Sequence, residues 1–209
     1  MKSFFKSIWF RCITVILSII LISGASIAIL SDVLYVSPEE RTMRGIEKVY
    51  GELVDYETIY DVDSDEFTLE TLPLVSRQLI KQEKGEITKI YMIGNGTEFL
   101  FQSVGFGGFK NGTVTVWVVV KININSNSIE KVVLESNKSQ SLIGNLKDGY
   151  YSNFELEDVT EAYENGEFFV TKGEGILNPV AGATYSANAG NNAVNCVIKY
   201  VGEVFSHEK

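Results

Sequence analysis

Histidine and cysteine are scarce in this 209-residue sequence, and their scarcity excludes several kinds of site. The only histidine is His207, which excludes a catalytic triad or proton relay that needs an imidazole within the domain. The two cysteines, Cys12 and Cys196, belong to no CxxC or Cys/His cluster, and no HExxH is present. Thiolate zinc sites and cysteine-ligated iron–sulfur clusters therefore lack ligands. Because Cys12 lies in an apolar run and Cys196 in an expected helix, we predict no disulfide between them.

Positive charge is also scarce after the first thirty residues, which hold Lys2, Lys6 and Arg11 and no acid. Residues 31–209 carry the other 15 of the 18 basic side chains and all 27 acidic ones, a net charge of −12. Such a surface argues against nucleic acid as a partner. The 45% hydrophobic and 22% charged residues are typical of a folded protein, which excludes disordered and collagen-like classes.

Residues 12–30 form an apolar run without a formal charge. As a helix the run rises about 28 Å, close to the ~30 Å hydrocarbon core of a bilayer. Basic residues precede it and acids follow it, so the positive-inside rule predicts a single-pass cell-membrane protein with a cytoplasmic N-terminus and an extracytoplasmic domain. The alternative is a cleaved signal peptide with Ser26-Ile27-Ala28 as its cleavage site, which also exports the domain.

The pattern after the anchor predicts helices first and strands later. Ser37-Pro38, with Glu40 three residues after the serine, predicts a helix start, and Gly51 predicts its end. An acidic connector with a short strand is expected over 52–70 and a short helix over 72–83. We expect three parts: a cytoplasmic start and anchor over 1–31, a helical, acidic part over 32–86, and the principal domain over 87–209.

The principal domain is predicted to be an antiparallel meander. Asn95-Gly96 and Asn111-Gly112 mark turns, and the run 116–120 is apolar on both faces, which predicts cover on both sides. The fold class is then α+β, an antiparallel sheet with flanking helices after one transmembrane helix. The expected strands cover 87–93, 99–104, 114–124, 129–135 and 168–170, and the closing helix covers 186–205.

Familiar ligand motifs are incomplete. Gly105-Phe-Gly107-Gly108-Phe-Lys110 precedes a strand and lacks the third glycine of a dinucleotide fingerprint, which leaves a hairpin turn or a close backbone approach to a ligand. No P-loop motif is present. The acids Asp61, Asp63 and Asp65, and the pair Glu157/Asp158, lack the calcium-loop pattern and are interpreted as solvated surface, so no metal site is predicted.

The segment 178–186 reads Asn-Pro-Val-Ala-Gly-Ala-Thr-Tyr-Ser and stands directly ahead of the last expected helix. Its small residues allow a tight turn, and Thr184 and Ser186 place hydroxyls at the helix start, where free N–H groups and the helix dipole favour a phosphate. The alternative interpretation is a small-residue turn with a hydroxyl N-cap.

The motif Gly182-Ala183-Thr184-Tyr185-Ser186 before a helix resembles the C-terminal motif of the FMN-binding domain family. Its membrane members include the G subunit of the Rnf ferredoxin:NAD⁺ oxidoreductase and the C subunit of the sodium-pumping NADH:quinone oxidoreductase. The resemblance spans about residues 103–201 and the anchor. It continues in Gly105-Phe-Gly107-Gly108, in the strand 129–135 and in Ser141-Leu142-Ile143-Gly144, near the family's flavin-contacting loop.

In that family a flavin transferase esterifies the last threonine of the motif to the phosphate of FMN. The resemblance therefore implies covalent FMN (phosphoester-threonyl-FMN) on Thr184 and an FMN-binding domain over 87–209. Asn178 and Ala181 stand where the family usually has Asp and Ser or Thr. The expected contacts to the cofactor come from Gly182, Ala183, Tyr185 and Ser186 and from Leu142 and Gly144.

The resemblance implies a membrane-anchored flavoprotein subunit that relays electrons in an ion-translocating Rnf-type complex, with other membrane subunits and the flavin transferase as partners. Such a chain is an electron-transfer subunit rather than a stand-alone enzyme, because the redox chemistry belongs to the flavin. The alternatives are the corresponding subunit of a sodium-pumping complex, a flavin-free anchored binding or scaffold module, and a stand-alone exported flavin reductase partner.

Overall fold

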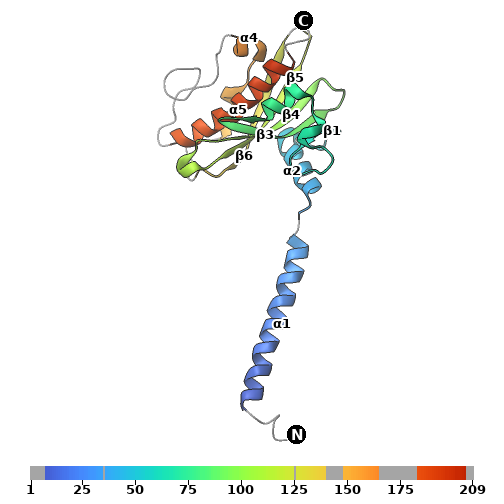
Figure 1. The fold of residues 1–209 in the computed structure, drawn as a ribbon, viewed down its shortest axis with the longest axis vertical. Coiled ribbons are helices and arrows are strands. Elements are labelled where there is room, and N and C mark those ends of the chain that lie inside the picture. The colour runs from blue at the N-terminus through green and yellow to red at the C-terminus, as the bar shows by residue number, and fades with distance from the viewer. Residues whose placement is uncertain (1–7, 35, 125, 140–147, 165–182, 206–209) are drawn as a thin grey trace. The chain divides into compact units, whose positions relative to one another are not determined.

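The structure is a computed structural model that describes residues 8–34, 36–124, 126–139, 148–164 and 183–205 (Figure 1). The chain divides into two compact units, Met1–Thr42 and Met43–Lys209. The predicted strand at 168–170 lies outside the described residues. Each unit is described by itself.

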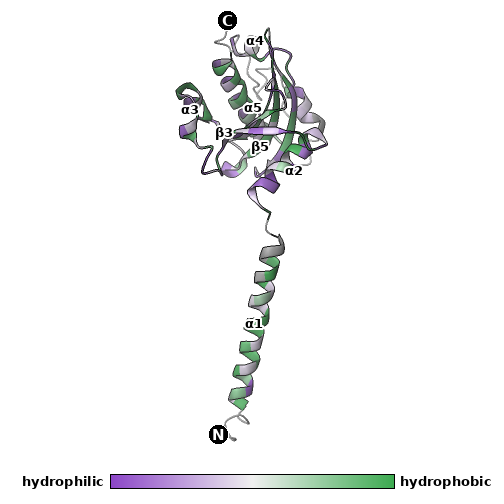
Figure 2. Cartoon of the chain, turned by 90° about the vertical axis from the view of Figure 1, so that its right-hand side faces the viewer, coloured by the Kyte–Doolittle hydropathy of each residue, from purple (hydrophilic) through white to green (hydrophobic). Residues whose placement is uncertain are grey.

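The first unit is dominated by α1 (Ile8–Leu34), which extends the predicted apolar run by one turn at each end. Its segment Ile8–Ile27 is long and apolar enough to cross a membrane, as the hydropathy colours of Figure 2 also show. Hydroxyls of Thr14, Ser18, Ser23 and Ser26 donate to carbonyl groups one turn earlier, for example Thr14 to Phe10 and Ser18 to Thr14, at 2.8 and 2.9 Å. These bonds satisfy the polar side chains within the helix itself.

The helix α2 (Pro38–Tyr50) begins and ends as the sequence predicts. The Ser37 hydroxyl accepts the backbone N–H of Glu40 at 3.1 Å, and proline occupies the first helical position. At the other end Gly51 has φ of +80° and donates its N–H to the Glu47 carbonyl at 2.7 Å. This left-handed glycine terminates the helix.

A six-stranded antiparallel sheet forms the centre of the second unit. The order β1-β3-β4-β5-β6 confirms the predicted meander, and the short β2 pairs with the start of β3. The strands are β1 (Tyr56–Asp61), β2 (Lys81–Gln82), β3 (Gly85–Ile93), β4 (Glu98–Gly105), β5 (Val114–Ile122) and β6 (Asn127–Asn137).

The remaining helices are short except the last. The helix predicted over 72–83 is shorter than expected, because Pro73 is its N-cap and residues 81–82 join the sheet as β2. The closing helix begins two residues earlier than predicted and ends one residue earlier. These elements are η2 (Leu69–Thr71), α3 (Leu74–Ile80), η3 (Phe109–Asn111), η5 (Asp148–Phe154), α4 (Val159–Glu164) and α5 (Thr184–Val204).

The strand β5 is buried on both faces, which confirms the prediction from its apolar run. Val116, Val118 and Val120 belong to a large apolar cluster shared with α5, and this side is called the α5 face. Trp117 and Val119 belong to a smaller cluster with Ile46 and Val49 of α2, and this side is called the α2 face. Figure 1 shows α5 running along the sheet. The observed class is α+β with flanking helices, as expected.

Candidate functional site

The start of α5 differs from the predicted hydroxyl cap. Thr184 is the first helical residue, and the N-cap is Ala183, which has no side chain able to cap. The interpretation of Thr184 or Ser186 as the N-cap is therefore wrong, because the helix starts two residues earlier than its apolar stripe suggests. The N–H groups of the first turn point out of the end of a 21-residue helix, where a negative group is favoured.

The two hydroxyls of the motif differ in access. Thr184 is partly exposed, whereas Ser186 is fully buried. Ala183 is also fully buried, and the ring of Tyr185 is 55% exposed. Of the two hydroxyls, that of Thr184 is the one that a reagent or enzyme can reach from solvent. The other expected contacts, Leu142, Gly144 and Gly182, lie outside the described residues.

The glycine segment after β4 brings the sheet against the backbone of α5. A Cβ on Gly105 would lie 1.8 Å from the carbonyl oxygen of Ala189 and 2.5 Å from the nitrogen of Ala193. Both atoms are backbone and cannot turn aside. The sequence allowed a close backbone approach to a ligand in this segment. In the structure Gly105 instead approaches the backbone of α5, and this contact fixes the distance between β4 and α5.

The rest of this segment is a tight loop between β4 and β5. Gly108 donates its N–H to the Gly112 carbonyl at 3.0 Å, and a Cβ on Gly108 would lie 2.5 Å from that same oxygen. At the tip Lys110 and Asn111 both have positive φ, 53° and 60°. Asparagine tolerates this conformation, whereas at lysine it costs about 1–2 kcal/mol. The loop therefore has a defined shape maintained by its own backbone bonds.

Three segments far apart in the sequence meet at this loop. The Asn192 amide of α5 donates to the Phe106 carbonyl at 2.7 Å. The rings of Phe109 and Tyr185 lie 5.7 Å apart. The buried hydroxyl of Ser139, just after β6, accepts the N–H of Phe109 at 2.9 Å. The glycine loop, the end of β6 and the start of α5 thus form one continuous region, at the left of the domain in Figure 1.

Two buried polar groups next to α5 have no hydrogen-bond partner within the described parts of the chain: the Tyr151 hydroxyl and the Asn191 Nδ2. Tyr150 donates its hydroxyl to Asn191 Oδ1 at 3.4 Å, and the Tyr151 hydroxyl lies 3.9 Å from where a Cβ on Gly190 would be. Burial raises the pKa of Tyr150 to about 12 and also raises the pKa of Tyr151. An unpaired buried group of this kind costs about 1–3 kcal/mol.

Sequence reasoning missed this pair, although a signal for Asn191 exists. Asn191 lies three residues before Val194 on the predicted apolar stripe of the closing helix, so it is a polar residue on a buried face. The tyrosine carries no comparable signal, because η5 comes next to α5 only in the folded chain.

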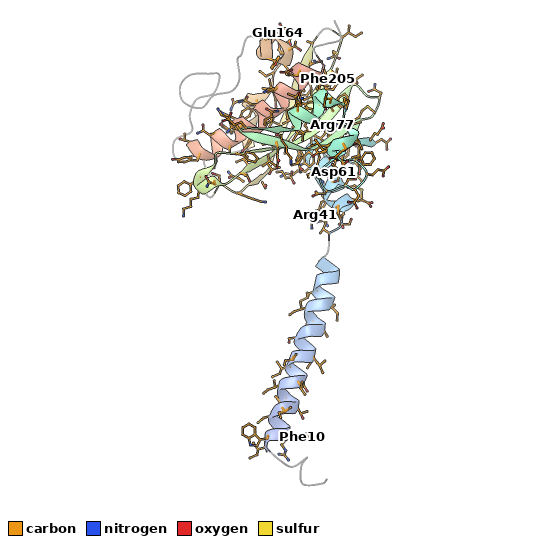
Figure 3. All side chains as sticks on the ribbon, in the orientation of Figure 1. Phe10, Arg41, Asp61, Arg77, Glu164 and Phe205 are labelled. Carbon is orange, nitrogen blue, oxygen red and sulfur yellow. The ribbon has the colours of Figure 1, made fainter. Side chains whose placement is uncertain are left out.

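The acids Asp61 and Asp63 both lie beside the same lysine, Lys89. Asp61, expected on a solvated surface, is instead paired with Lys89 at 2.9 Å and accepts the Tyr91 hydroxyl at 3.0 Å (Figure 3). Asp63 lies 3.1 Å from the same lysine and is largely exposed, as expected. In the portion of the chain that the structure describes, no group of three His, Cys, Asp or Glu side chains could hold a metal ion.

No protein-family model, curated protein or solved structure matches this chain. The likeness to the FMN-binding domain family therefore stays a prediction from the motif.

Proposed function

We propose that the protein is a membrane-anchored flavoprotein that holds FMN at the start of α5, by a phosphoester to Thr184, and relays electrons within a membrane complex. The observation that carries the proposal is the meeting of the glycine loop, Ser139 and the first turn of α5 in one region. The glycine loop and the start of α5 carry the motifs of the sequence, and Ser139 joins them through the N–H of Phe109.

The residues present fit a phosphorylated, hydrogen-bonding cofactor. The open end of a long helix favours the phosphate, and the accessible Thr184 hydroxyl stands in its first turn. The unpaired groups of Tyr151 and Asn191 offer hydrogen bonds to a molecule that enters this region. When bound, the flavin supplies the one- and two-electron chemistry that no side chain here offers.

The side chains have separate tasks in this proposal. Thr184 provides the oxygen that carries the covalent bond, and such a bond prevents loss of the cofactor by dilution outside the cell. Asn192 holds the glycine loop against α5 through the Phe106 carbonyl. The exposed Tyr185 ring lies beside Phe109, so both rings are positioned at the edge of the region.

The charges around α1 and the resemblance of the motif support our proposals for the side of the membrane and for the complex. The basic residues before α1 and the acids after it support a cytoplasmic N-terminus and an exported domain. One helix offers no ion path, so ion translocation requires other membrane subunits. We propose an Rnf-type complex, with a sodium-pumping quinone oxidoreductase as the related alternative.

The intact mass of the purified chain tests the flavin directly. Produced together with a flavin transferase, the wild type should gain the mass of one FMN less one water, the amount expected for a phosphoester. Thr184→Ala should gain none, and Thr184→Ser should be partly labelled because a hydroxyl remains. Ser186→Ala tests the other hydroxyl of the motif and should keep its covalent label, since Ser186 is buried. Covalent flavin on Thr184→Ala, or a flavin peptide elsewhere in the chain, would refute the assignment.

Two further measurements separate the alternatives. Asn178→Asp with Ala181→Ser should load at least as much flavin as the wild type, and a clear fall would show that the transferase reads a different pattern. Protease added to cells stripped of outer barriers should digest the domain and spare the anchor. A chain without flavin absorbance would favour the scaffold module, and a protected domain would place it in the cytoplasm.

A further inference from the structure

The Tyr151 hydroxyl belongs to η5 and the Asn191 amide nitrogen to α5, and both lie where these two elements meet. Neither group has a hydrogen-bond partner among the described residues. Both residues are at most 2% exposed, so water does not reach them freely. Tyr150 occupies the Asn191 Oδ1 by donating its hydroxyl, which leaves the amide nitrogen as a donor. A hydroxyl and an amide N–H that both lack acceptors in the described part of the chain match a ligand that carries acceptor atoms.

The position of Asn191 along the helix indicates which part of a ligand it would meet. It lies seven residues after Thr184, which is two turns and a rise of about 10 Å on the same side of the helix. Residues 187 and 190 between them are alanine and glycine, and Ala187 is fully buried. A cofactor attached through its phosphate to Thr184 would therefore place the end farthest from the phosphate at the level of Asn191.

We propose that Tyr151 and Asn191 hydrogen-bond acceptor atoms of the flavin ring system and so determine where the ring lies. This inference rests on the proposed function and extends it to two positioning residues. The ring carries carbonyl oxygens and unprotonated nitrogens along one edge, and these are acceptors of the kind that the two donors require.

The experiment measures the binding of FMN and riboflavin to the full-length chain, purified in detergent from a host without the flavin transferase. Quenching of flavin fluorescence gives the affinities, and thermal unfolding without flavin gives the stability. Tyr151→Phe should weaken both ligands about tenfold, the usual order for one lost hydrogen bond. Its flavin-free melting temperature should be unchanged or higher, because the hydroxyl has no partner to lose. Asn191→Leu should weaken both ligands further.

Tyr163→Phe is the matched control. The Tyr163 hydroxyl donates to Glu203 at 2.5 Å, near the other end of α5, where Figure 3 labels Glu164 and Phe205. This variant should lower the melting temperature and leave both flavin affinities unchanged.

Three results would overturn the inference while the proposed function stands. The first is a Tyr151→Phe variant that binds both flavins as tightly as the wild type. The second is a loss of affinity for FMN but not for riboflavin, which would assign the two residues to the phosphate. The third is a lower stability of Tyr151→Phe in the absence of flavin. A wild type that binds neither ligand, and also gains no covalent flavin with the transferase, would refute the proposed function and the inference with it.

Discussion

The α2 face of the sheet buries polar side chains that are bonded to one another. On the α5 face, the Tyr151 hydroxyl and the Asn191 amide nitrogen are buried without a hydrogen-bond partner among the described residues. On the α2 face Lys89 is paired with Asp61, and Gln102 donates to Glu135 at 2.5 Å. The exception there is the indole N–H of Trp117, which lies under Gly45. The α2 face is therefore largely complete within the chain, while the α5 face leaves hydrogen-bonding capacity for something else.

The two faces also differ in how closely their helices approach. On the α5 face, Gly105 lets the backbone of the helix touch the end of a strand, so neither element can shift without the other. On the α2 face, Gly45 lies against the Trp117 ring, which is a side chain. Function located on the α5 side would thus have a rigid support.

Gly105→Ala should have the largest effect, because its Cβ would overlap backbone atoms of α5. We expect a loss of at least about 3 kcal/mol of unfolding free energy, measured in urea. Gly51→Ala is the control: its Cβ would meet no atom within 4 Å, and only the positive φ should cost about 1 kcal/mol. Similar losses in the two variants would show that the close approach is not important for stability.

Asp61→Ala tests the bonded network on the α2 face. It removes the nearer carboxylate from Lys89 and the acceptor of Tyr91, and both partners are mostly buried. We expect a loss of about 2 kcal/mol in the free energy of unfolding. Asp63→Ala should cost less than about 0.5 kcal/mol, since that carboxylate is largely exposed. An equal cost for both would contradict the assignment of Asp61 as the structural partner.

Alkaline unfolding should report the apolar character of the α5 face. Burial raises the pKa of Cys196 from 9.0 to about 12, so the folded chain keeps a proton that the unfolded chain releases. Its contribution to stability is complete below pH 9 and is lost as the pH rises toward 12, at roughly 1 kcal/mol per pH unit. Urea titrations at each pH should show this loss of unfolding free energy. In Cys196→Ala the loss should begin only near pH 10, where Tyr150 starts to ionise in the unfolded chain.

Gly190→Ala should have the smallest effect and the opposite sign. A Cβ here would lie 3.6 Å from the nearest atom, a ring carbon of Tyr151, which is an ordinary contact. Because alanine favours a helix interior over glycine, we expect a gain of about 0.5–1 kcal/mol in the free energy of unfolding, measured in urea. A loss would mean that the space between α5 and η5 is tighter than its geometry indicates.

The elements that the sequence predicted well are those defined by local signals. The cap at Ser37, the stop at Gly51, and the turn residues and apolar runs of β3 to β6 depend on neighbours in the chain, and the structure has these elements as expected. The start of α5 differs from the prediction because Ala183 has no side chain that signals a cap. The apolar residues of the helix alone do not mark its first turn.

The candidate site was predictable only in part. Thr184 and the glycines of the loop between β4 and β5 stand out in the sequence, and the fold brings their segments together. Packing determines that Ser186 is buried while Thr184 is accessible. The Tyr151 hydroxyl is buried because η5 lies against α5, and it finds no hydrogen-bond partner among the described residues. Neither fact has a local pattern from which it could be inferred.

The strand β5 has hydrogen-bonded neighbours on both edges and apolar cover on both faces. Amide protons in such a strand exchange with solvent only when much of the domain opens, so β5 should retain deuterium longest. Val114, its first residue, lies 4.0 Å from where a Cβ on Gly190 would be. The α5 residues that follow Thr184 therefore pack on the strand expected to open most slowly. A molecule that binds there should lose little affinity to the entropic cost of ordering the protein.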